Sequence, residues 1–269
     1  MRLSGHHAVV TGGGTGIGAA IAHALAAEGA RVTLVGRRLE PLQTTAESLR
    51  SSRAKSRGAG TESELRPSTS LGTNEVFCCT ADVTVRSEVD HAFAAAHDAN
   101  GPITILVNNA GAASGEPFAK VSETLWRDML AVNLDGMFHC CQAALPDLLA
   151  TERGRIVTVA SMAGLHGFAY AAPYIAAKHG AVGLTRALAA EFVKTPLTAN
   201  AVCPGFVDSD MTVRSVANIT SKTGRSEEAA RAELARLNPS GRLIAPEEVA
   251  AVTLDLILSD RNGEAVEIA

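Results

Sequence analysis

The chain has 269 residues, of which 46% are hydrophobic and 19% charged, and its formal net charge is −4 at pH 7. This length suffices for one large core, and a weakly acidic balance gives no reason to expect nucleic acid or an anionic membrane as a partner. No apolar run reaches the roughly 18 residues of a spanning helix, and the N-terminal apolar run is too short for a signal peptide, so we expect a cytoplasmic protein.

The first recognisable element is a glycine-rich turn within HAVVTGGGTGIG, residues 7–18, which leads from an apolar run into a helical pattern. Strand, glycine turn and helix in this order form the first half of a dinucleotide-binding βαβ unit. Gly12 can supply the tight turn, Gly16 can let backbone N–H groups approach a pyrophosphate, and Gly18 can let the helix lie close to the strand. The spacing is G-x-x-x-G-x-G instead of the commoner G-x-G-x-x-G, so by itself the turn is also compatible with an ordinary loop.

The rest of the chain alternates between two patterns. Apolar runs predict strands at 31–35, 76–83, 103–111, 154–161 and 198–203. Helical spacing predicts helices at 39–50, 85–100, 122–149 and 172–193. This alternation indicates a parallel sheet covered on both faces. We expect one Rossmann-type α/β domain over 1–269 with a doubly wound sheet of about seven strands, and ligands at the carboxyl edge of that sheet.

Residues 51–75 interrupt the alternation. They are polar, rich in Ser, Gly and Arg, and lack periodicity, so they carry too little apolar surface to become ordered. We predict a flexible surface loop over 51–75, with a basic binding segment as the alternative.

A phenol and an ammonium group lie four residues apart in Tyr174-Ile-Ala-Ala-Lys178, which places them on one helical face. A lysine charge about 4 Å away is worth around 4 kcal/mol at an effective dielectric near 20, or about three pKa units. Lys178 can therefore bring the pKa of the phenol close to neutral pH, so that Tyr174 can act as an acid or base. The alternative is an interfacial tyrosine with a solvated lysine. Ser161 follows a strand thirteen residues before Tyr174 and can donate to a substrate carbonyl, and Asn133 lies on the preceding long helix.

The end of the second strand bears on the choice of nucleotide. NAD-binding units place an acidic residue there, where it accepts from the ribose hydroxyls. In this chain that position is Gly36, followed by Arg37 and Arg38. A guanidinium group can bind a phosphate through two parallel charge-assisted hydrogen bonds, so these residues favour NADP(H), with NAD(H) as the alternative if both arginines are only solvated loop charges.

Several motifs together resemble the short-chain dehydrogenase/reductase family. They are TGGGTGIG, Asp82-Val83, NNAG, Asn133, Ser161, Y-x-x-x-K and Pro204-Gly205, in this order from about Leu3 to Ile268. The stretches AAPYIAAKHGAVGLTRALAAE and TANAVCPGFVDSDM are most similar to 3-oxoacyl-thioester reductases and the ketoreductases of aromatic polyketide synthesis.

The resemblance implies a role for each matching residue. Tyr174 would be the general acid in carbonyl reduction, and Ser161 would hold the substrate oxygen. Lys178 would bind the nicotinamide ribose and lower the tyrosine pKa, and Asn133 would position a water for proton relay. The cofactor contacts would be Gly12, Thr15, Gly16, Ile17, Gly18, Arg37, Arg38, Asp82, Val83, Asn109, Ala110, Gly111, Tyr174, Lys178, Pro204, Gly205, Val207 and Ser209.

The implied activity is hydride transfer between NADP(H) and a carbonyl/secondary alcohol pair, such as a 3-oxoacyl thioester or a related ketone. The alternatives are an NAD-dependent dehydrogenase of a 3-hydroxyacyl thioester or other secondary alcohol, and a non-catalytic nucleotide-sensing protein. The resemblance also implies a homotetramer. Two features depart from the family, namely the length of 51–75 and the lack of D-G-G after the last strand.

The remaining polar residues give weaker signals. His6 and His7 precede the first strand and are expected to face solvent or cap it. His139 adjoins a cysteine pair, but neighbouring helical residues point in different directions, so core packing is favoured over a metal site. Five cysteines without C-x-x-C spacing indicate buried reduced thiols and no metal. His166 follows Ser161 in a loop that usually borders the substrate, so a substrate contact is left open.

Overall fold

A parallel sheet runs through the centre of the molecule. The computed structural model describes residues 1–56 and 76–269, without the side chains of 53–56. Within these ranges seven strands pair in parallel in the order β3-β2-β1-β4-β5-β6-β7. They are β1 (His7–Thr11), β2 (Arg31–Gly36), β3 (Val76–Thr80), β4 (Ile105–Asn108), β5 (Arg155–Val159), β6 (Thr198–Pro204) and β7 (Ala265–Ile268). The expected doubly wound sheet is confirmed, and its order reverses between β1 and β4.

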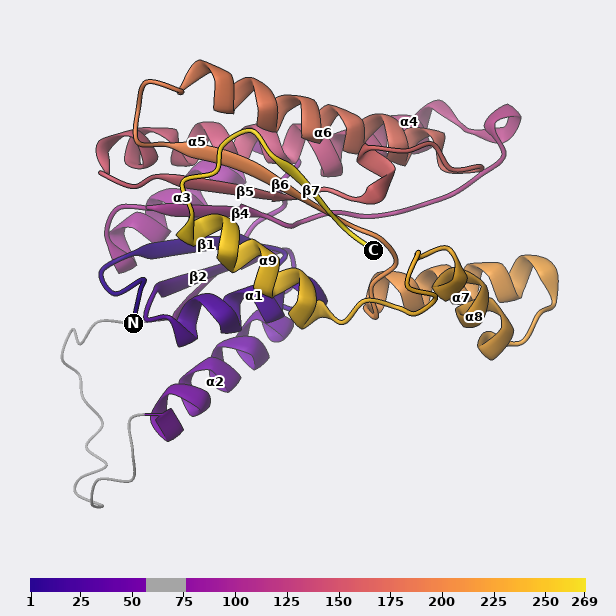
Figure 1. Cartoon of the computed structure of the whole chain (residues 1–269), viewed down its shortest axis with the longest axis horizontal. Helices are drawn as coiled ribbons and strands as arrows, with labels where there is room; N and C mark the ends of the chain where they lie inside the picture. Colours follow the sequence, from indigo (N-terminus) through magenta and orange to yellow (C-terminus); the bar gives the residue numbers. More distant parts are fainter. Residues whose placement is uncertain (57–75) are drawn as a thin grey trace.

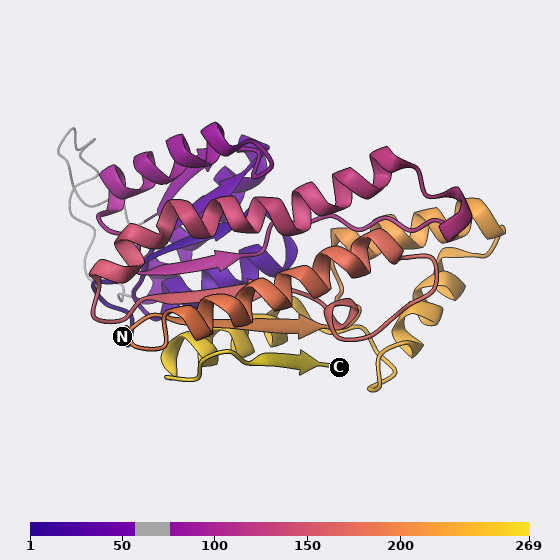
Figure 2. The same cartoon turned by 90° about the horizontal axis from the view of Figure 1, so that it is seen from above.

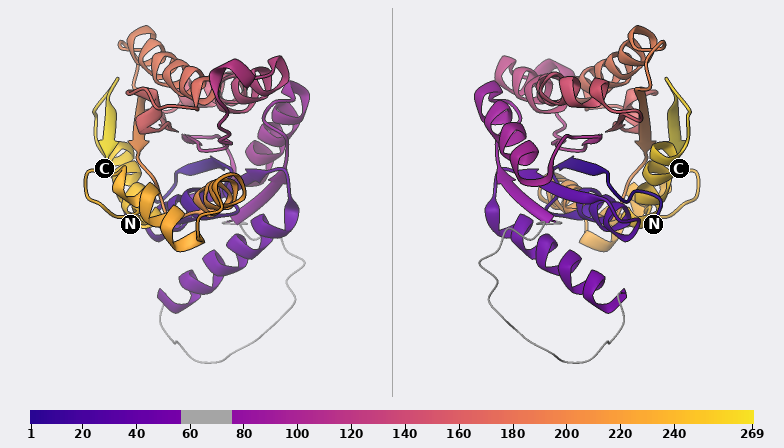
Figure 3. Two further views of the ribbon diagram at one scale, coloured as in Figure 1. Left: turned by 90° about the vertical axis from the view of Figure 1, so that its right-hand side faces the viewer. Right: turned by 90° about the vertical axis from the view of Figure 1, so that its left-hand side faces the viewer.

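Helices cover both faces of this sheet, as Figure 1 and the end-on views of Figure 3 show. One face carries α1 (Gly16–Ala27), α2 (Leu39–Ser56) and α9 (Pro246–Leu258). The other carries α3 (Arg86–Asn100), α5 (Gly136–Ala150) and α6 (Ala172–Glu191). Because both faces are covered, β1 has all five residues buried, which explains why it reads as an apolar run.

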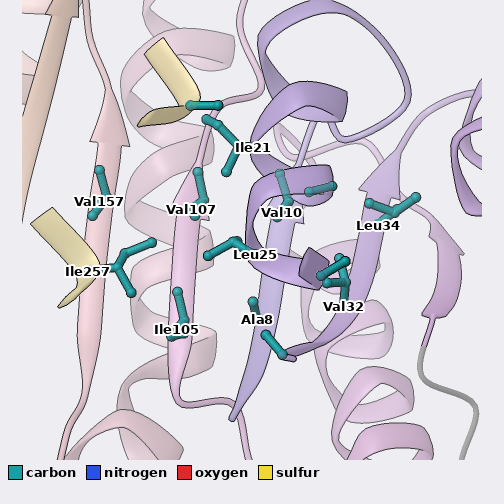
Figure 4. Packing of buried hydrophobic residues seen from close by; sticks show 14 of the residues in the cluster. Ala8, Val10, Ile21, Leu25, Val32, Leu34, Ile105, Val107, Val157 and Ile257 are labelled. Carbon is teal, nitrogen blue, oxygen red and sulfur yellow. The ribbon is translucent and has the colours of Figure 1, made fainter. Parts of the chain in front are cut away.

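The core on the α1 side is built from aliphatic side chains at helical and strand spacing. In Figure 4, Ile21 and Leu25 of α1 extend over Val10 of β1 and Val107 of β4, and Ile257 of α9 lies beside them. Burial of such a side chain is worth about 1.5–3 kcal/mol. These contacts hold α1 against β1 and β4, next to the glycine turn.

Two of the predicted segments differ from the structure. The helix α2 continues to Ser56, so the first residues of the predicted loop 51–75 are helical, and the rest of that loop, 57–75, lies outside the described residues. The predicted helix 122–149 is interrupted by a π-helical turn, η2 (Ala131–Asp135), between α4 (Glu123–Leu130) and α5. Within this turn the Asn133 side-chain amide donates to the Met129 carbonyl oxygen at 3.0 Å, which is the acceptor of an ordinary α-helical bond from residue 133.

The remaining helices lie beyond the carboxyl ends of the strands. They are α7 (Asp210–Thr223), α8 (Glu227–Arg236) and the short turns η1 (Phe118–Lys120) and η3 (Met162–Gly164). Figure 2 shows the strand arrows pointing towards the side where α7 and α8 lie. No helix in the described ranges has the length and apolarity needed to cross a membrane.

His7 corrects a prediction. Instead of facing solvent, its side chain is fully buried, and its ring nitrogens lie 2.7 Å from the Gly101 carbonyl oxygen and 2.8 Å from the Thr33 hydroxyl. Burial lowers the pKa of His7 to about 4. This imidazole is therefore a neutral core group that joins β1, β2 and the end of α3.

Candidate active site

The glycine turn after β1 has the geometry that its sequence predicts. Gly12 adopts φ +64°, a left-handed conformation that glycine tolerates best. A Cβ on Gly18 would lie 2.2 Å from the Gly12 carbonyl oxygen, so only glycine lets α1 approach the strand this closely. The helix starts at Gly16 with no side-chain cap and no acidic residue in its first turn. Its free N–H groups make this helix end suitable for a phosphate.

An open cleft begins at this helix end. The predicted nucleotide contacts that line it are Gly12, Thr15, Gly16, Ile17, Gly18, Arg37, Arg38, Asp82, Val83, Asn109, Ala110, Gly111 and Ser209. Gly36, the position after the second strand, also lines it, and the lining residues that the sequence did not suggest are Gly14, Pro41, Leu42, Ala81, Val132, Asp210, Met211 and Arg214. The five other predicted contacts, Tyr174, Lys178, Pro204, Gly205 and Val207, are not part of this lining.

The NNAG segment is fastened to the glycine turn. The Asn109 side-chain amide donates to the carbonyl oxygens of Thr11 at 2.9 Å and of Gly12 at 3.1 Å. The Thr11 hydroxyl accepts from the backbone N–H groups of Asn109 and Ala110 at 2.9 and 3.0 Å. The Asn109 side chain therefore fixes the position of the glycine turn at the cleft, and hydrogen bonds connect NNAG and the glycine turn.

Charges gather at the end of the cleft formed by β2 and β3. Arg37 and Arg38 are exposed. The Asp82 carboxylate accepts from the backbone N–H and the hydroxyl of Thr84 at 2.9 and 2.7 Å. Burial raises the pKa of Asp82, but these two bonds and the Arg37 charge outweigh burial and leave the pKa below its ordinary value. A carboxylate thus stands near the arginine pair.

Ser161 and Tyr174 lie close enough beyond β5 for the serine hydroxyl to act on the pKa of the phenol. Ser161 is the N-cap residue of η3, and its hydroxyl accepts from the Ala163 backbone N–H at 3.1 Å. Tyr174 lies in the first turn of α6. Burial raises the pKa of Tyr174, and its hydrogen bond with Ser161 opposes that rise without cancelling it. The phenol therefore keeps its proton at neutral pH.

Lys178 shares the α6 face of Tyr174, as the spacing predicts. Its side chain is 5% exposed, and its ammonium group donates to the Val159 carbonyl oxygen at 3.0 Å. Burial lowers the pKa of Lys178 to about 8. The expected fall in the tyrosine pKa is not found, because burial outweighs every stabilisation of the phenolate.

Asn133 connects the π-helical turn to the loop after β4. Its side-chain amide donates to the Ala112 carbonyl at 2.9 Å, and its side-chain oxygen accepts from the Ala112 N–H at 3.3 Å. A Cβ on Gly111 would lie 2.8 Å from that oxygen and 3.7 Å from the Lys178 ammonium nitrogen. Asn133, Gly111 and Lys178 are thus close together, while the role of Asn133 in proton relay stays a prediction.

The turn after β6 is held by a residue that the sequence did not suggest. Asn238, only 2% exposed, accepts from the Phe206 N–H at 2.8 Å and donates to the Phe206 carbonyl at 2.9 Å. Gly205 donates its backbone N–H to Ile268 at 2.8 Å. The Val207 side chain is buried in the core, so this residue can meet a ligand only through its backbone. No motif marks Asn238, because its contacts lie 32 positions away.

The other candidate ligands are placed elsewhere. His139 is partly buried, with its ring 3.0 Å from the Val83 carbonyl oxygen, which agrees with core packing. His166 is exposed and lies 3.4 Å from the Glu267 carboxylate. The five cysteines are free thiols, and the described residues contain no cluster of three His, Cys, Asp or Glu side chains suited to a metal ion.

The chain resembles known proteins over most of its length. A family model described as short chain dehydrogenase matches residues 6–67 and 59–220. A Streptomyces coelicolor protein named ketoacyl reductase is 38% identical over 252 residues, which cover 93% of this chain and 89% of the relative. A D-beta-hydroxybutyrate dehydrogenase of Cupriavidus necator is 34% identical over 94% of this chain and 91% of its own length.

Solved structures agree with these relatives. The crystal structure of a variant of actinorhodin polyketide ketoreductase with NADPH has a TM-score of 0.87 and 34% identity, and the match covers 100% of this chain and 97% of the other. Levodione reductase has a TM-score of 0.86 and 29% identity, over 99% of this chain and 97% of the other.

Proposed function

The chain belongs to the short-chain dehydrogenase family, and we propose that it is an NADPH-dependent reductase that converts a ketone into a secondary alcohol. The observation that carries this proposal is the Ser161–Tyr174 pair with Lys178 one helical turn further along, beside a cleft that begins at the N-terminus of α1. Bound NADPH supplies the hydride. The residues of the chain supply position, polarisation and a proton.

We assign the proton to Tyr174. Since burial raises its pKa, the phenol is protonated at neutral pH and suits the role of general acid towards a ketone oxygen. The Ser161 hydroxyl holds and polarises that oxygen, and Lys178 stabilises the negative charge that develops on the phenol. A largely protonated tyrosine favours reduction over oxidation at neutral pH.

The N-terminus of α1 fits the cofactor diphosphate, and the residues after β2 fit the 2′-phosphate of NADPH. Gly36 leaves the ribose position without a carboxylate, and the exposed guanidinium groups of Arg37 and Arg38 line the same cleft. A charge-assisted hydrogen bond contributes about 1.5–3 kcal/mol, and each 1.4 kcal/mol is a tenfold change in affinity. The arginine pair therefore favours NADPH over NADH.

The substrate is a ketone of the 3-oxoacyl-thioester class or a related polyketide. The names of the relatives, ketoacyl reductase and polyketide ketoreductase, support this class. The cytoplasm is the compartment that fits a pool of such thioesters and NADPH.

A homotetramer is the proposed assembly. Phe138 and Leu149 on α5 are 43% and 37% exposed, which leaves apolar surface on the outer face of that helix. Light scattering at micromolar concentrations tests this assembly, and a monomer would contradict it.

The experiment for the activity is a panel of ketones and secondary alcohols assayed with NADPH and NADH, together with the dissociation constants of both cofactors. We expect NADPH to bind at least tenfold more tightly than NADH. Arg37→Ala should weaken NADPH selectively. Arg236→Ala, at an exposed position on α8 outside the cleft lining, is the matched control for the lost charge. Tighter NADH binding by the parent enzyme would contradict the cofactor assignment.

A further inference from the structure

Helix α7 supplies a wall of the nucleotide cleft with a charged residue that no motif assigns. Asp210, Met211 and Arg214 line the cleft together with the glycine turn. Asp210 and Arg214 are four residues apart and therefore share a helical face. The first turns of α7 thus present both residues to the same space as α1, and Arg214 is the cation among them.

The start of α7 lies against the start of α1. A Cβ on Gly16, the first residue of α1, would lie 3.4 Å from the Cβ of Ser209, the residue before α7. The N-terminus of α1 is where the diphosphate of a dinucleotide fits this fold. Arg214 therefore lines the cleft from the helix that follows Ser209, next to the N-terminus of α1, whereas Arg37 lines it from the end of β2.

Arg214 has an unpaired charge. In the described part of the chain three other cations of this two-helix segment have acidic partners: Lys222 lies 3.3 Å from Glu116, Arg231 lies 2.6 Å from Asp208, and Arg225 pairs with Glu233. Arg236 forms no ion pair with a described residue either, but it lies outside the cleft lining. Arg214 is exposed, and its side chain forms no hydrogen bond or ion pair with any described residue. An exposed guanidinium that lines this cleft and forms no ion pair with a described residue is suited to an anionic ligand.

We propose that Arg214, on α7, is a binding residue for the diphosphate of the nucleotide cofactor. The backbone N–H groups at the N-terminus of α1 bind the same diphosphate. This inference rests on the proposed function, since it requires a dinucleotide in the cleft. It separates two tasks among the arginines. Arg214 binds the phosphates that NADPH and NADH share, and Arg37 binds the 2′-phosphate that distinguishes them.

Fragments of the cofactor test this division without any turnover. ADP carries the diphosphate and 2′-AMP carries the 2′-phosphate, and calorimetric titration gives the dissociation constant of each with the full-length protein. Arg214→Ala should weaken ADP, NADPH and NADH about tenfold and leave 2′-AMP unchanged, since one charge-assisted hydrogen bond is worth about that factor. Arg37→Ala should weaken 2′-AMP and NADPH and leave ADP unchanged.

Two further variants complete the experiment. Arg214→Lys keeps the charge but not the planar fork, and should restore most of the ADP affinity. Arg236→Ala removes an exposed charge of α8 outside the cleft and should change none of the constants. An unchanged ADP affinity in Arg214→Ala, or a loss confined to 2′-AMP and NADPH, overturns the inference. If the parent protein binds neither NADPH nor NADH, the proposed function fails with it, which is a distinguishable result.

Discussion

The ammonium nitrogen of Lys178 lies 5.8 Å from the ring centroid of Tyr174, and the same group donates to the Val159 carbonyl oxygen at 3.0 Å. One lysine therefore connects the end of β5 with the proposed acid on α6. The cost of this position is burial of a cation, which lowers the Lys178 pKa to about 8. Catalysis and stability consequently make opposite demands on this residue.

Replacing Tyr174 by Phe should remove the proposed proton donor and little else. A positioned general acid contributes about 10²–10⁴-fold, so we expect kcat to fall by that factor. The Kd of NADPH, measured by fluorescence titration, and the melting temperature should stay close to those of the parent protein. A Tyr174→Phe enzyme with nearly parental turnover would contradict the mechanism. Tyr170→Phe, at an exposed tyrosine of the preceding loop, is the matched control.

Replacing Lys178 by Met should reduce activity and at the same time stabilise the fold. In the folded state the pKa of Lys178 is lowered, so the unfolded chain binds more protons between pH 8 and 10.5, and this residue opposes folding at pH 7. Removal of the buried charge relieves that cost, and the unpaired Val159 carbonyl offsets part of the gain. We expect about 1–2 kcal/mol more stability in urea unfolding at pH 7, with weaker NADPH binding. Lower stability of Lys178→Met would show that the ammonium group stabilises the fold.

The ion pair between Lys222 of α7 and Glu116 of the loop after β4 joins two segments that border the candidate active site. Glu116 also donates its backbone N–H to the Tyr170 carbonyl at 2.7 Å, and the pair itself spans 3.3 Å. An exposed pair contributes about 0–1 kcal/mol, so Lys222→Gln should leave the melting temperature nearly unchanged. Because the pair restrains α7, we expect KM for the ketone to change severalfold and kcat to change little.

The matched control for this variant is Arg225→Gln, which breaks an exposed pair with Glu233 inside the α7–α8 segment. Equal KM changes in both variants would show that the contact across the two segments has no specific role. High salt should reproduce the effect of Lys222→Gln in the parent enzyme, because it screens exposed charges.

The features predicted correctly from the sequence are those set by local pattern. Apolar strands alternate with helices because both sheet faces are covered, and the glycine turn places Gly12 and Gly18 where a side chain would not fit. The spacing of Tyr174 and Lys178 determines their common face on α6. Each of these predictions depends on neighbours a few residues away.

The features that were not predicted depend on partners far along the chain. The Asn133 side chain, which lies in the π-helical turn, bonds to Ala112 in a loop 21 positions earlier. The ring of the buried His7 lies next to the Gly101 carbonyl oxygen, which is 94 positions away in the sequence. Arg214 belongs to no motif, and it lines the cleft because the turn before α7 brings Ser209 close to Gly16 of α1. Periodicity and spacing in the sequence do not predict contacts between residues so far apart.

The buried imidazole of His7 should make the protein less stable in mild acid. Its pKa is about 4 in the folded state and about 6.5 in the unfolded chain, so between these values the unfolded chain binds more protons. The contribution of His7 is therefore fully present above pH 6.5 and is lost as the pH falls towards 4. Between pH 7.5 and pH 5 the linkage relation gives a loss of about 2 kcal/mol from this residue.

Urea unfolding at these two pH values measures the loss. His7→Asn should be less stable than the parent at pH 7.5, because the bonds to Gly101 and Thr33 are weakened, but its stability should fall about 2 kcal/mol less on acidification. His91→Asn, the same change at an exposed position of α3, should keep the pH dependence of the parent. Since burial also lowers the pKa of His6, some acid sensitivity remains in every variant, and the difference between His7→Asn and the parent isolates the buried ring. An identical pH dependence in His7→Asn and the parent would show that the imidazole of His7 is not the group that titrates.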